Sequence, residues 1–138
     1  MSGAPRIALV DDQALIRAGL RALLQQQGID IVFEADSGEA LLARLALQPV
    51  QLVVSDIRMP GMDGIQALQA LRARGDATPC LFLTTFDDSD LLLRATAAGA
   101  QGFLLKDAAP EDLREAIVRI VAGQALLQPV STDPVRQR

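Results

Sequence analysis

The chain has no histidine among its 138 residues, and it also lacks tryptophan and tyrosine. Without histidine there can be no Ser-His-Asp or Cys-His nucleophilic site, no histidine-ligated zinc and no phosphohistidine carrier. Its one cysteine, Cys80, excludes an internal disulfide and is typical of a reducing compartment. The chemistry open to the chain therefore rests on carboxylates, hydroxyls, lysine and a hard metal ion.

Positive charge, aromatic rings and long apolar runs are also scarce. The net charge is −4, and the four aromatic residues are all phenylalanine. We expect no nucleic-acid binding by this segment, because such binding needs a positive surface and usually stacking rings. Charges break the apolar stretches well short of the about 20 residues that cross a membrane, and residues 1–5 lack the features of a signal peptide. We therefore expect a cytoplasmic protein that does not associate with a membrane.

Short β-rich runs alternate with segments of helical periodicity along most of the chain. Local signals mark several helix ends, such as the N-cap Ser37, the C-cap Gly28 and the first-turn proline Pro110. Strict β-α alternation predicts an α/β fold, a doubly wound parallel sheet of five strands with helices on both faces. The predicted strands are 6–10, 30–34, 50–55, 79–83 and 102–105. The predicted helices occupy 13–27, 38–47, a stretch from about 63, a stretch that stops at 99 and a stretch from 110.

The length suits one domain with one hydrophobic core. In the first predicted helix an apolar stripe is formed by Ile16, Leu20, Leu23 and Leu24. After Gly123 the periodicity is lost, and residues 124–138 carry two prolines. We expect a domain at 1–123 and a linker at 124–138 that leads toward a further domain absent from this chain.

Polar side chains stand at the ends of four of the predicted strands. In open α/β sheets, ligands bind beyond the carboxyl ends of the strands, where the strand order reverses. Adopting the flavodoxin-like order 2-1-3-4-5, we expect these side chains to converge on one crevice. A further carboxylate, Asp36, follows the second strand but lies at the sheet edge in this order. The converging residues are Asp11, Asp12, Asp56, Thr84, Thr85 and Lys106.

Three carboxylates in one crevice repel one another, so a bound cation or protonation is required. All-oxygen ligands without histidine favour Mg²⁺ or Mn²⁺ over zinc. Such a site suits phosphoryl transfer: the metal and a lysine neutralise phosphoryl oxygens while an aspartate attacks phosphorus to give an acyl phosphate.

Four segments, Val10–Asp12, Asp56–Gly64, Leu83–Thr85 and Phe103–Lys106, together resemble the receiver domain of bacterial two-component response regulators. The resemblance covers about residues 6–123, with every landmark in order. Residues 98–107 are similar to the NarL-like subfamily, whose members carry a LuxR-type helix-turn-helix DNA-binding domain after a linker. The resemblance implies a signalling switch, not an enzyme, with self-phosphorylation and self-dephosphorylation as its only chemistry.

The resemblance also implies partners and residue roles. A sensor histidine kinase would supply the phosphoryl group, phosphorylation would favour a homodimer, and DNA would bind through the missing C-terminal domain to control transcription. The resemblance implies that Asp56 is the phosphoacceptor and that Mg²⁺ is held by Asp11, Asp12, Asp56 and the backbone carbonyl of Arg58. It implies that Thr84, Lys106 and the backbone of Thr85 contact the phosphoryl group. It also implies that Thr84 and Phe103 form the switch and that Arg58 and Phe86 tune the rate of dephosphorylation.

The chain departs from the family pattern at two positions. Phe103 stands where many receivers have tyrosine, so no switch hydroxyl is present. Asp107 stands where many have proline, which leaves open whether the Lys106–Asp107 bond is cis; that isomer costs about 2.5–4 kcal/mol without proline. The run Leu91–Leu93 cannot all face one core, so at least one leucine should face outward, either as a partly covered side chain or as a partner surface.

Each motif taken alone also has a purely structural interpretation. An isolated Asp-Asp pair is most often a helix N-cap, and a single lysine is usually a surface charge. Two alternative functions are a Mg²⁺-dependent phosphohydrolase with an aspartyl nucleophile and a flavodoxin-like mononucleotide binder. The first normally has an aspartate two positions beyond the nucleophile, where Arg58 stands, and in the second Asp11 and Asp12 would repel phosphate.

Overall fold

The structure is a computed structural model that describes residues 3–85 and 89–126. Its sheet has five strands in the order β2-β1-β3-β4-β5, and every neighbouring pair is parallel. The predicted fold class and strand order are therefore confirmed. The strands are β1 (Arg6–Val10), β2 (Asp30–Ala35), β3 (Leu52–Asp56), β4 (Cys80–Thr84) and β5 (Gly102–Leu105).

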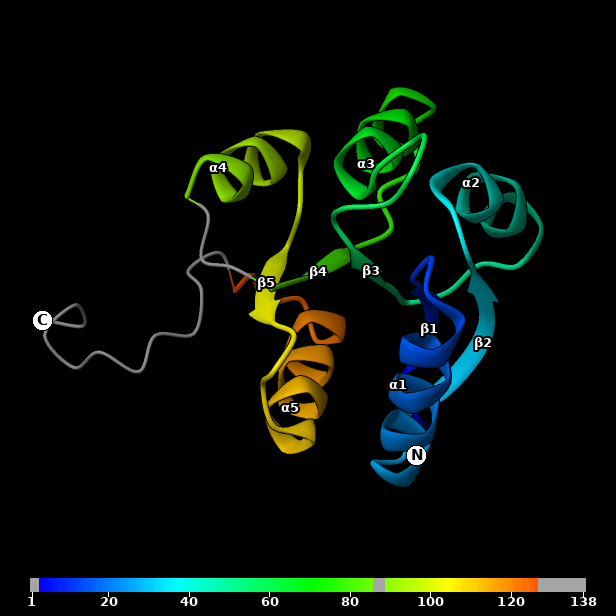
Figure 1. The fold of residues 1–138 in the computed structure, drawn as a ribbon, viewed down its shortest axis with the longest axis vertical. Helices are drawn as coiled ribbons and strands as arrows, with labels where there is room; N and C mark the ends of the chain where they lie inside the picture. The colour runs from blue at the N-terminus through cyan, green and yellow to red at the C-terminus, as the bar shows by residue number, and fades with distance from the viewer. Residues whose placement is uncertain (1–2, 86–88, 127–138) are drawn as a thin grey trace, which may run out of the picture.

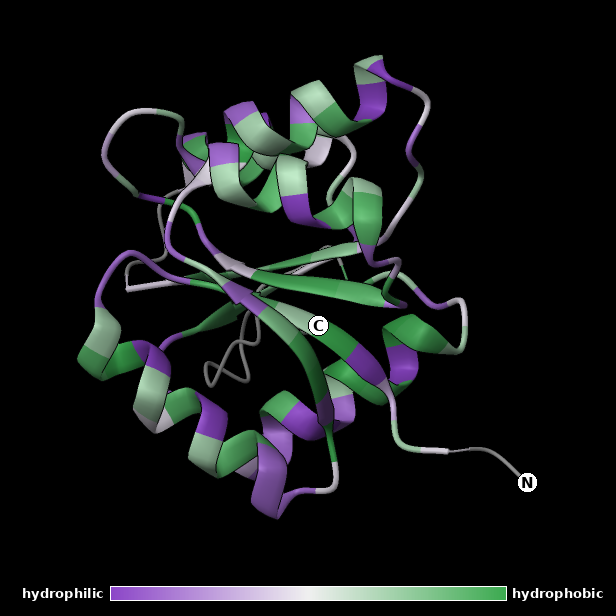
Figure 2. Cartoon of the chain, turned by 90° about the vertical axis from the view of Figure 1, so that its right-hand side faces the viewer, coloured by the Kyte–Doolittle hydropathy of each residue, from purple (hydrophilic) through white to green (hydrophobic). Residues whose placement is uncertain are grey.

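Helices cover both faces of the sheet. Figure 1 shows α2, α3 and α4 on one face and α1 and α5 on the other, and Figure 2 shows the sheet between these two layers. The helices are α1 (Ala14–Gln26), α2 (Gly38–Leu47), α3 (Gly64–Ala73), α4 (Ser89–Ala98) and α5 (Pro110–Val121). In the described ranges, no helix has the length and apolar character needed to cross a membrane.

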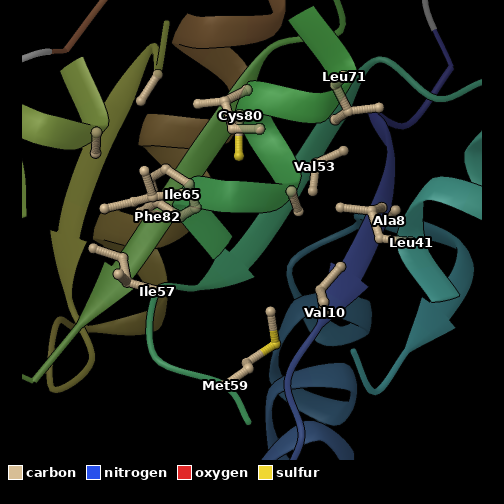
Figure 3. Close-up of a cluster of buried hydrophobic side chains, with 14 of the residues drawn as sticks. Ala8, Val10, Leu41, Val53, Ile57, Met59, Ile65, Leu71, Cys80 and Phe82 are labelled. Carbon is tan, nitrogen blue, oxygen red and sulfur yellow. The ribbon is translucent and has the colours of Figure 1, made fainter. Parts of the chain in front are cut away.

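The strands are apolar on both faces, as expected when helices cover each side of a parallel sheet. Successive residues of a strand point to opposite faces, so β3 buries Val53 on the α2–α4 side and Leu52 and Val54 on the α1 and α5 side. Figure 3 shows the first of these two clusters, in which Ile65 of α3 and Phe82 of β4 are labelled. Two clusters of aliphatic side chains and phenylalanine thus hold the layers together.

Predicted helix signals appear in the structure. The Ser37 hydroxyl oxygen accepts the Ala40 N–H at 3.0 Å and caps α2. Gly28 ends α1 with a φ of +80°, a left-handed conformation that glycine adopts without a Cβ clash. The predicted stripe of α1 needs correction, because Ile16 and Leu23 are each 42% exposed while Leu24 is fully buried. The inward face of α1 runs through Leu20 and Leu24, two members of the predicted stripe, which pack in the cluster that contains Ile7 and Leu9 of β1.

In the run Leu91–Leu93, Leu92 is buried and Leu93 is 68% exposed, which confirms that at least one leucine faces outward.

After its last helix, α5, which ends at Val121, the chain returns to the sheet. The Leu126 N–H donates to the Gln101 carbonyl at 2.7 Å, and Leu126 forms a parallel bridge with Gly102 of β5. The first residues after Gly123 therefore lie along the outer edge of β5. The domain boundary at residue 123 stays a prediction.

The connection between β3 and α3 is held close to both elements. Gly61 has a φ of +73°, and the Ile57 carbonyl accepts the Gly64 N–H at 2.8 Å. Asp63 caps α3 through a reciprocal pair of hydrogen bonds with Gln66. This arrangement sets the start of α3 directly beside the carboxyl end of β3.

Candidate functional site

Three carboxylates gather where β1 and β3 end side by side. Val10 pairs with Ser55 in the sheet, so the residues that follow them, Asp11 and Asp56, leave adjacent strands at the same edge. One carboxylate oxygen from each of Asp11, Asp12 and Asp56 lies within 4.8 Å of the others. Asp11 is only 1% exposed, and the other two are partly buried. The predicted convergence of these residues is present.

Lys106 approaches the carboxylates from the end of β5. Its Nζ lies 2.8 Å from Asp56 Oδ2 and 3.7 Å from Asp11 Oδ2. By the two-residue alternation of a strand, Asp11, Asp56 and Lys106 continue the side that faces α1 and α5. Lys106 is also the sole lysine of the chain. The position of Lys106 after the last strand predicted that it lies near the site. In the structure its ammonium group pairs with two of the three carboxylates, those of Asp56 and Asp11.

The charge of Lys106 is stabilised by its surroundings. Burial by itself lowers the pKa of this lysine, because it disfavours the ammonium form. The hydrogen bond to Asp56 and the negative charges of Asp56 and Asp11 act in the opposite direction and outweigh burial, so the pKa of Lys106 is raised above its ordinary value. The lysine therefore remains a cation beside the carboxylates at neutral pH.

Asp11 is anchored through three of its own atoms or groups. Its N–H donates to the Ala35 carbonyl of β2 at 3.1 Å, its Oδ1 accepts the Gln13 N–H at 2.9 Å, and its carbonyl accepts Arg17 Nη1 at 2.6 Å. Arg17 in turn pairs with Glu34 of β2 at 3.0 Å. Sequence reasoning missed both Arg17 and Glu34. The signal that could have found Glu34 is an acidic residue that follows the apolar run 31–33 in β2.

The remaining predicted site residues lie around this centre. Thr84 is the buried last residue of β4, and its carbonyl accepts the Lys106 N–H at 2.8 Å. Thr85 and Arg58 are exposed, on the connections after β4 and β3. Phe103 is 1% exposed in the core cluster on the α2–α4 side, opposite to the side of Lys106. Their roles stay predictions, and Phe86 lies outside the described residues.

Two other predictions concern the backbone and the sheet edge. The described part of the chain contains no cis peptide bond, so the Lys106–Asp107 bond is trans. Asp36, which follows the edge strand β2, is exposed and is not one of the three clustered carboxylates. The observed centre is therefore confined to the ends of β1, β3 and β5.

The chemistry of the centre fits a hard divalent cation. Three carboxylates stand against one ammonium group, which leaves excess negative charge in a partly buried crevice. The donors are all oxygens, the ligand type that Mg²⁺ prefers. Asp11, Asp12 and Asp56 are therefore the residues that could hold such an ion.

Known proteins are similar to this chain in sequence and in fold. YxjL, an uncharacterized transcriptional regulatory protein of Bacillus subtilis, is 34% identical over 131 residues, which cover 94% of this chain and 60% of that protein. The response regulator UvrY of Escherichia coli is 34% identical over 119 residues, which cover 86% of this chain and 55% of UvrY. The chain spans about 60% of the length of the curated relatives it matches.

Solved structures agree with these relatives. The receiver domain of the putative response regulator NarL from Mycobacterium tuberculosis superposes with a TM-score of 0.84 at 31% identity, over 89% of this chain and 100% of that one. The response regulator ChrA of a heme-sensing two-component system superposes with a TM-score of 0.77 at 40% identity, over 92% of this chain and 61% of that one. The family model described as the response regulator receiver domain matches residues 7–118. With the sheet order, the clustered carboxylates and the lysine all in place, we conclude that the chain belongs to the response regulator receiver domain family.

Proposed function

We propose that the domain accepts a phosphoryl group on Asp56 from a phosphohistidine of a partner kinase and changes conformation in response. The observation that carries the proposal is the meeting of Asp56 with Lys106 at 2.8 Å, beside Asp11 and Asp12 at the end of the sheet. A carboxylate flanked by a fixed ammonium group and two further carboxylates has both a nucleophilic oxygen and the means to neutralise an incoming phosphoryl group.

In the proposed reaction, a carboxylate oxygen of Asp56 forms a bond to phosphorus. The P–N bond of the kinase phosphohistidine breaks, its electron pair stays on the ring nitrogen, and that nitrogen takes a proton from solvent. Lys106 supplies positive charge to the phosphoryl oxygens from the position it already holds beside Asp56. Asp11, Asp12 and Asp56, together with the Arg58 carbonyl, would hold Mg²⁺, which when bound neutralises phosphoryl charge.

The acceptor assignment is tested by intact-mass measurement after incubation with acetyl phosphate and Mg²⁺. Wild type should gain the mass of one phosphoryl group, and Asp56→Asn should gain none. Asp36→Asn is the matched control, because Asp36 is an exposed carboxylate at a neighbouring strand end outside the cluster. Full labelling of Asp56→Asn would show that another residue accepts the phosphoryl group.

Metal dependence is tested in the same assay. Asp12→Ala removes one of three clustered carboxylates and should leave too few ligands to compete with the hydration shell of Mg²⁺. Its labelling should be far slower than that of wild type at the same Mg²⁺ concentration. Normal labelling of the wild type in excess EDTA would remove the metal from the proposal.

We also propose that this receiver controls a DNA-binding domain in a longer protein. Support comes from the relatives, several of which are named transcriptional regulatory proteins and extend well beyond the matched segment. On this proposal, phosphorylation of Asp56 shifts the population toward a conformation that pairs with a second copy. A gel shift tests the part of this proposal that assigns DNA binding to another domain. Residues 1–138 alone should show no sequence-selective DNA binding, and selective binding by this segment would contradict the assignment.

A further inference from the structure

Arg17 connects three elements beside the acidic cluster. Its Nη1 donates to the carbonyl oxygen of Asp11 at 2.6 Å, a short charge-assisted bond. Its Nε donates to Glu34 Oε1 at 3.0 Å, and Arg21 Nη1 donates to the other oxygen of the same carboxylate at 2.7 Å. The guanidinium group of Arg17 thus joins α1 to the end of β1 and to the edge strand β2, with Glu34 as its fixed support.

Local helix preference does not account for Arg17. The residue lies close to the start of α1, where the helix dipole favours anions and disfavours cations. The first turn of α1 has no acidic residue, and Gln13 makes no side-chain cap hydrogen bond. The side chains of Arg17 and Glu34 are 20% and 22% exposed, so both are partly withdrawn from water. Arg17 is therefore held in place by its contacts with Asp11 and Glu34.

The contact with Asp11 has a geometric consequence for Asp12. The Asp11 carbonyl and the Asp12 N–H belong to one planar peptide unit, so fixing the carbonyl also fixes the start of Asp12. That plane fixes the positions of Asp12 N and Cα, from which the Asp12 side chain leaves the backbone. The N–H and the side chain of Asp11 already have partners in Ala35 and Gln13, and Arg17 supplies the partner of its carbonyl.

We propose that Arg17 is a positioning residue that aims the Asp12 carboxylate for Mg²⁺ binding by holding the Asp11–Asp12 peptide. The inference rests on the proposed function, since it requires that Asp11, Asp12 and Asp56 bind the metal. Arg17 touches neither the metal nor the phosphoryl group in this role. It acts through the backbone, and Glu34 acts through Arg17.

Positioning and plain electrostatics predict opposite effects on metal affinity. Arg17 is a cation near a cation site, so removing its charge alone should tighten Mg²⁺ binding. Removing the hydrogen bond to the Asp11 carbonyl should weaken binding, because the Asp12 carboxylate is then no longer aimed at the cluster. Arg17→Lys separates the two effects, since lysine keeps the charge but lacks the fork that reaches Glu34 and the carbonyl together.

The experiment is a Mg²⁺ titration of the full chain followed by amide NMR shifts of residues 11, 12 and 56. Arg17→Lys and Arg17→Ala should each raise the dissociation constant by about tenfold, the scale found when partners that orient metal ligands are removed. Arg21→Ala is the matched control, because Arg21 pairs with the same Glu34 carboxylate but does not contact Asp11. The affinity of Arg21→Ala for Mg²⁺ should equal that of wild type or be slightly tighter. Glu34→Ala should weaken binding, and Arg17→Ala/Glu34→Ala should be no weaker than Arg17→Ala alone.

Labelling by acetyl phosphate gives a second measurement. If Arg17 acts by aiming a metal ligand, the Arg17→Lys rate should be low at limiting Mg²⁺ and approach the wild-type rate at saturating Mg²⁺. Unchanged or tighter Mg²⁺ binding in both Arg17 variants would overturn this inference while leaving the proposed function intact. Absence of saturable binding in wild type would overturn both. Arg17→Lys keeps the test valid if Arg17→Ala loses the amide dispersion of a folded domain.

Discussion

A Cβ atom on Gly64 would lie 2.5 Å from the carbonyl oxygen of Asp56 and 2.8 Å from Cε1 of Phe82. The first residue of α3 therefore abuts the backbone of the proposed phosphoacceptor, and no larger residue fits without a shift of β3 or α3. The Gly64 N–H also donates to the Ile57 carbonyl at 2.8 Å. This close approach keeps the end of β3, and with it the Asp56 side chain, at a fixed place relative to α3.

Gly64→Ala should destabilise the domain by about 1–3 kcal/mol, the usual cost of forcing an extra methyl group into a packed site. Gly19→Ala is the matched control, because Gly19 lies inside α1 with no atom within 4 Å of the added Cβ. That substitution should stabilise by about 0.5–1 kcal/mol. Urea unfolding followed by circular dichroism measures both, and equal stabilities of the two variants would show that the contact at Gly64 is readily relieved.

Lys106 should titrate above its ordinary pKa of 10.5 in the folded protein. Since the pKa is raised on folding, the stabilisation is fully present below that ordinary, unfolded-state pKa and is lost as the pH rises through the folded value. The stability difference between wild type and Lys106→Met should thus be constant from pH 7 to 9 and shrink at higher pH. Because both proteins contain Cys80, whose pKa burial raises to about 12, its contribution cancels from the difference.

The measurement is direct because Lys106 is the sole lysine. Lysine labelled with ¹³C at Cε gives one side-chain signal whose shift reports the pKa. In Asp56→Asn the largest favourable partner loses its charge, so the pKa should move downward. A wild-type pKa at or below 10.5 would contradict the ion pair seen with Asp56.

The lifetime of the phosphorylated domain should be long. Arg58 and Phe86, two positions beyond Asp56 and Thr84, would flank the path of the hydrolytic water in this family, and neither can act as a general base at neutral pH. Phe86→Ala should therefore shorten the half-life of the acyl phosphate, as followed by loss of the phosphoryl mass after the donor is removed. An unchanged decay rate would exclude Phe86 as a barrier to water.

Phe103 should transmit the phosphorylated state through packing alone, because it has no hydroxyl group. It is buried on the α2–α4 side of β5, beside β4, which ends at Thr84. Thr84→Ala and Phe103→Ala should keep some labelling of Asp56 but lose the response to beryllofluoride, a phosphoryl mimic, whereas Phe103→Tyr should be tolerated.

Two readouts follow that response: sedimentation, and amide exchange over residues 89–106, which include the exposed Leu93. If wild type and Phe103→Ala respond alike, Phe103 serves only the core and the coupling must run through other elements.

Much of the fold could be predicted from the sequence because the deciding signals are local. Alternating β-rich and helical segments require a covered parallel sheet, whatever the details of packing. Ser37, Gly28 and Pro110 mark helix ends through interactions within a few residues. The carboxyl ends of parallel strands meet at one edge, and the adopted flavodoxin-like order sets β1 beside β3, so the convergence of Asp11, Asp12 and Asp56 follows from that order.

Tertiary structure decided what local patterns leave open. The apolar residues of α1 allow more than one inward face, and packing chose the face with Leu24, leaving Ile16 and Leu23 half exposed. The contacts of Arg17 with Glu34 and of Lys106 with Asp56 join residues 17 and 50 positions apart. Such contacts depend on strand register and helix placement, which no short segment encodes. The sequence by itself therefore determined which groups reach the site, while tertiary packing determined how they are held: α1 and β2 around Asp11, and α3 beside Asp56.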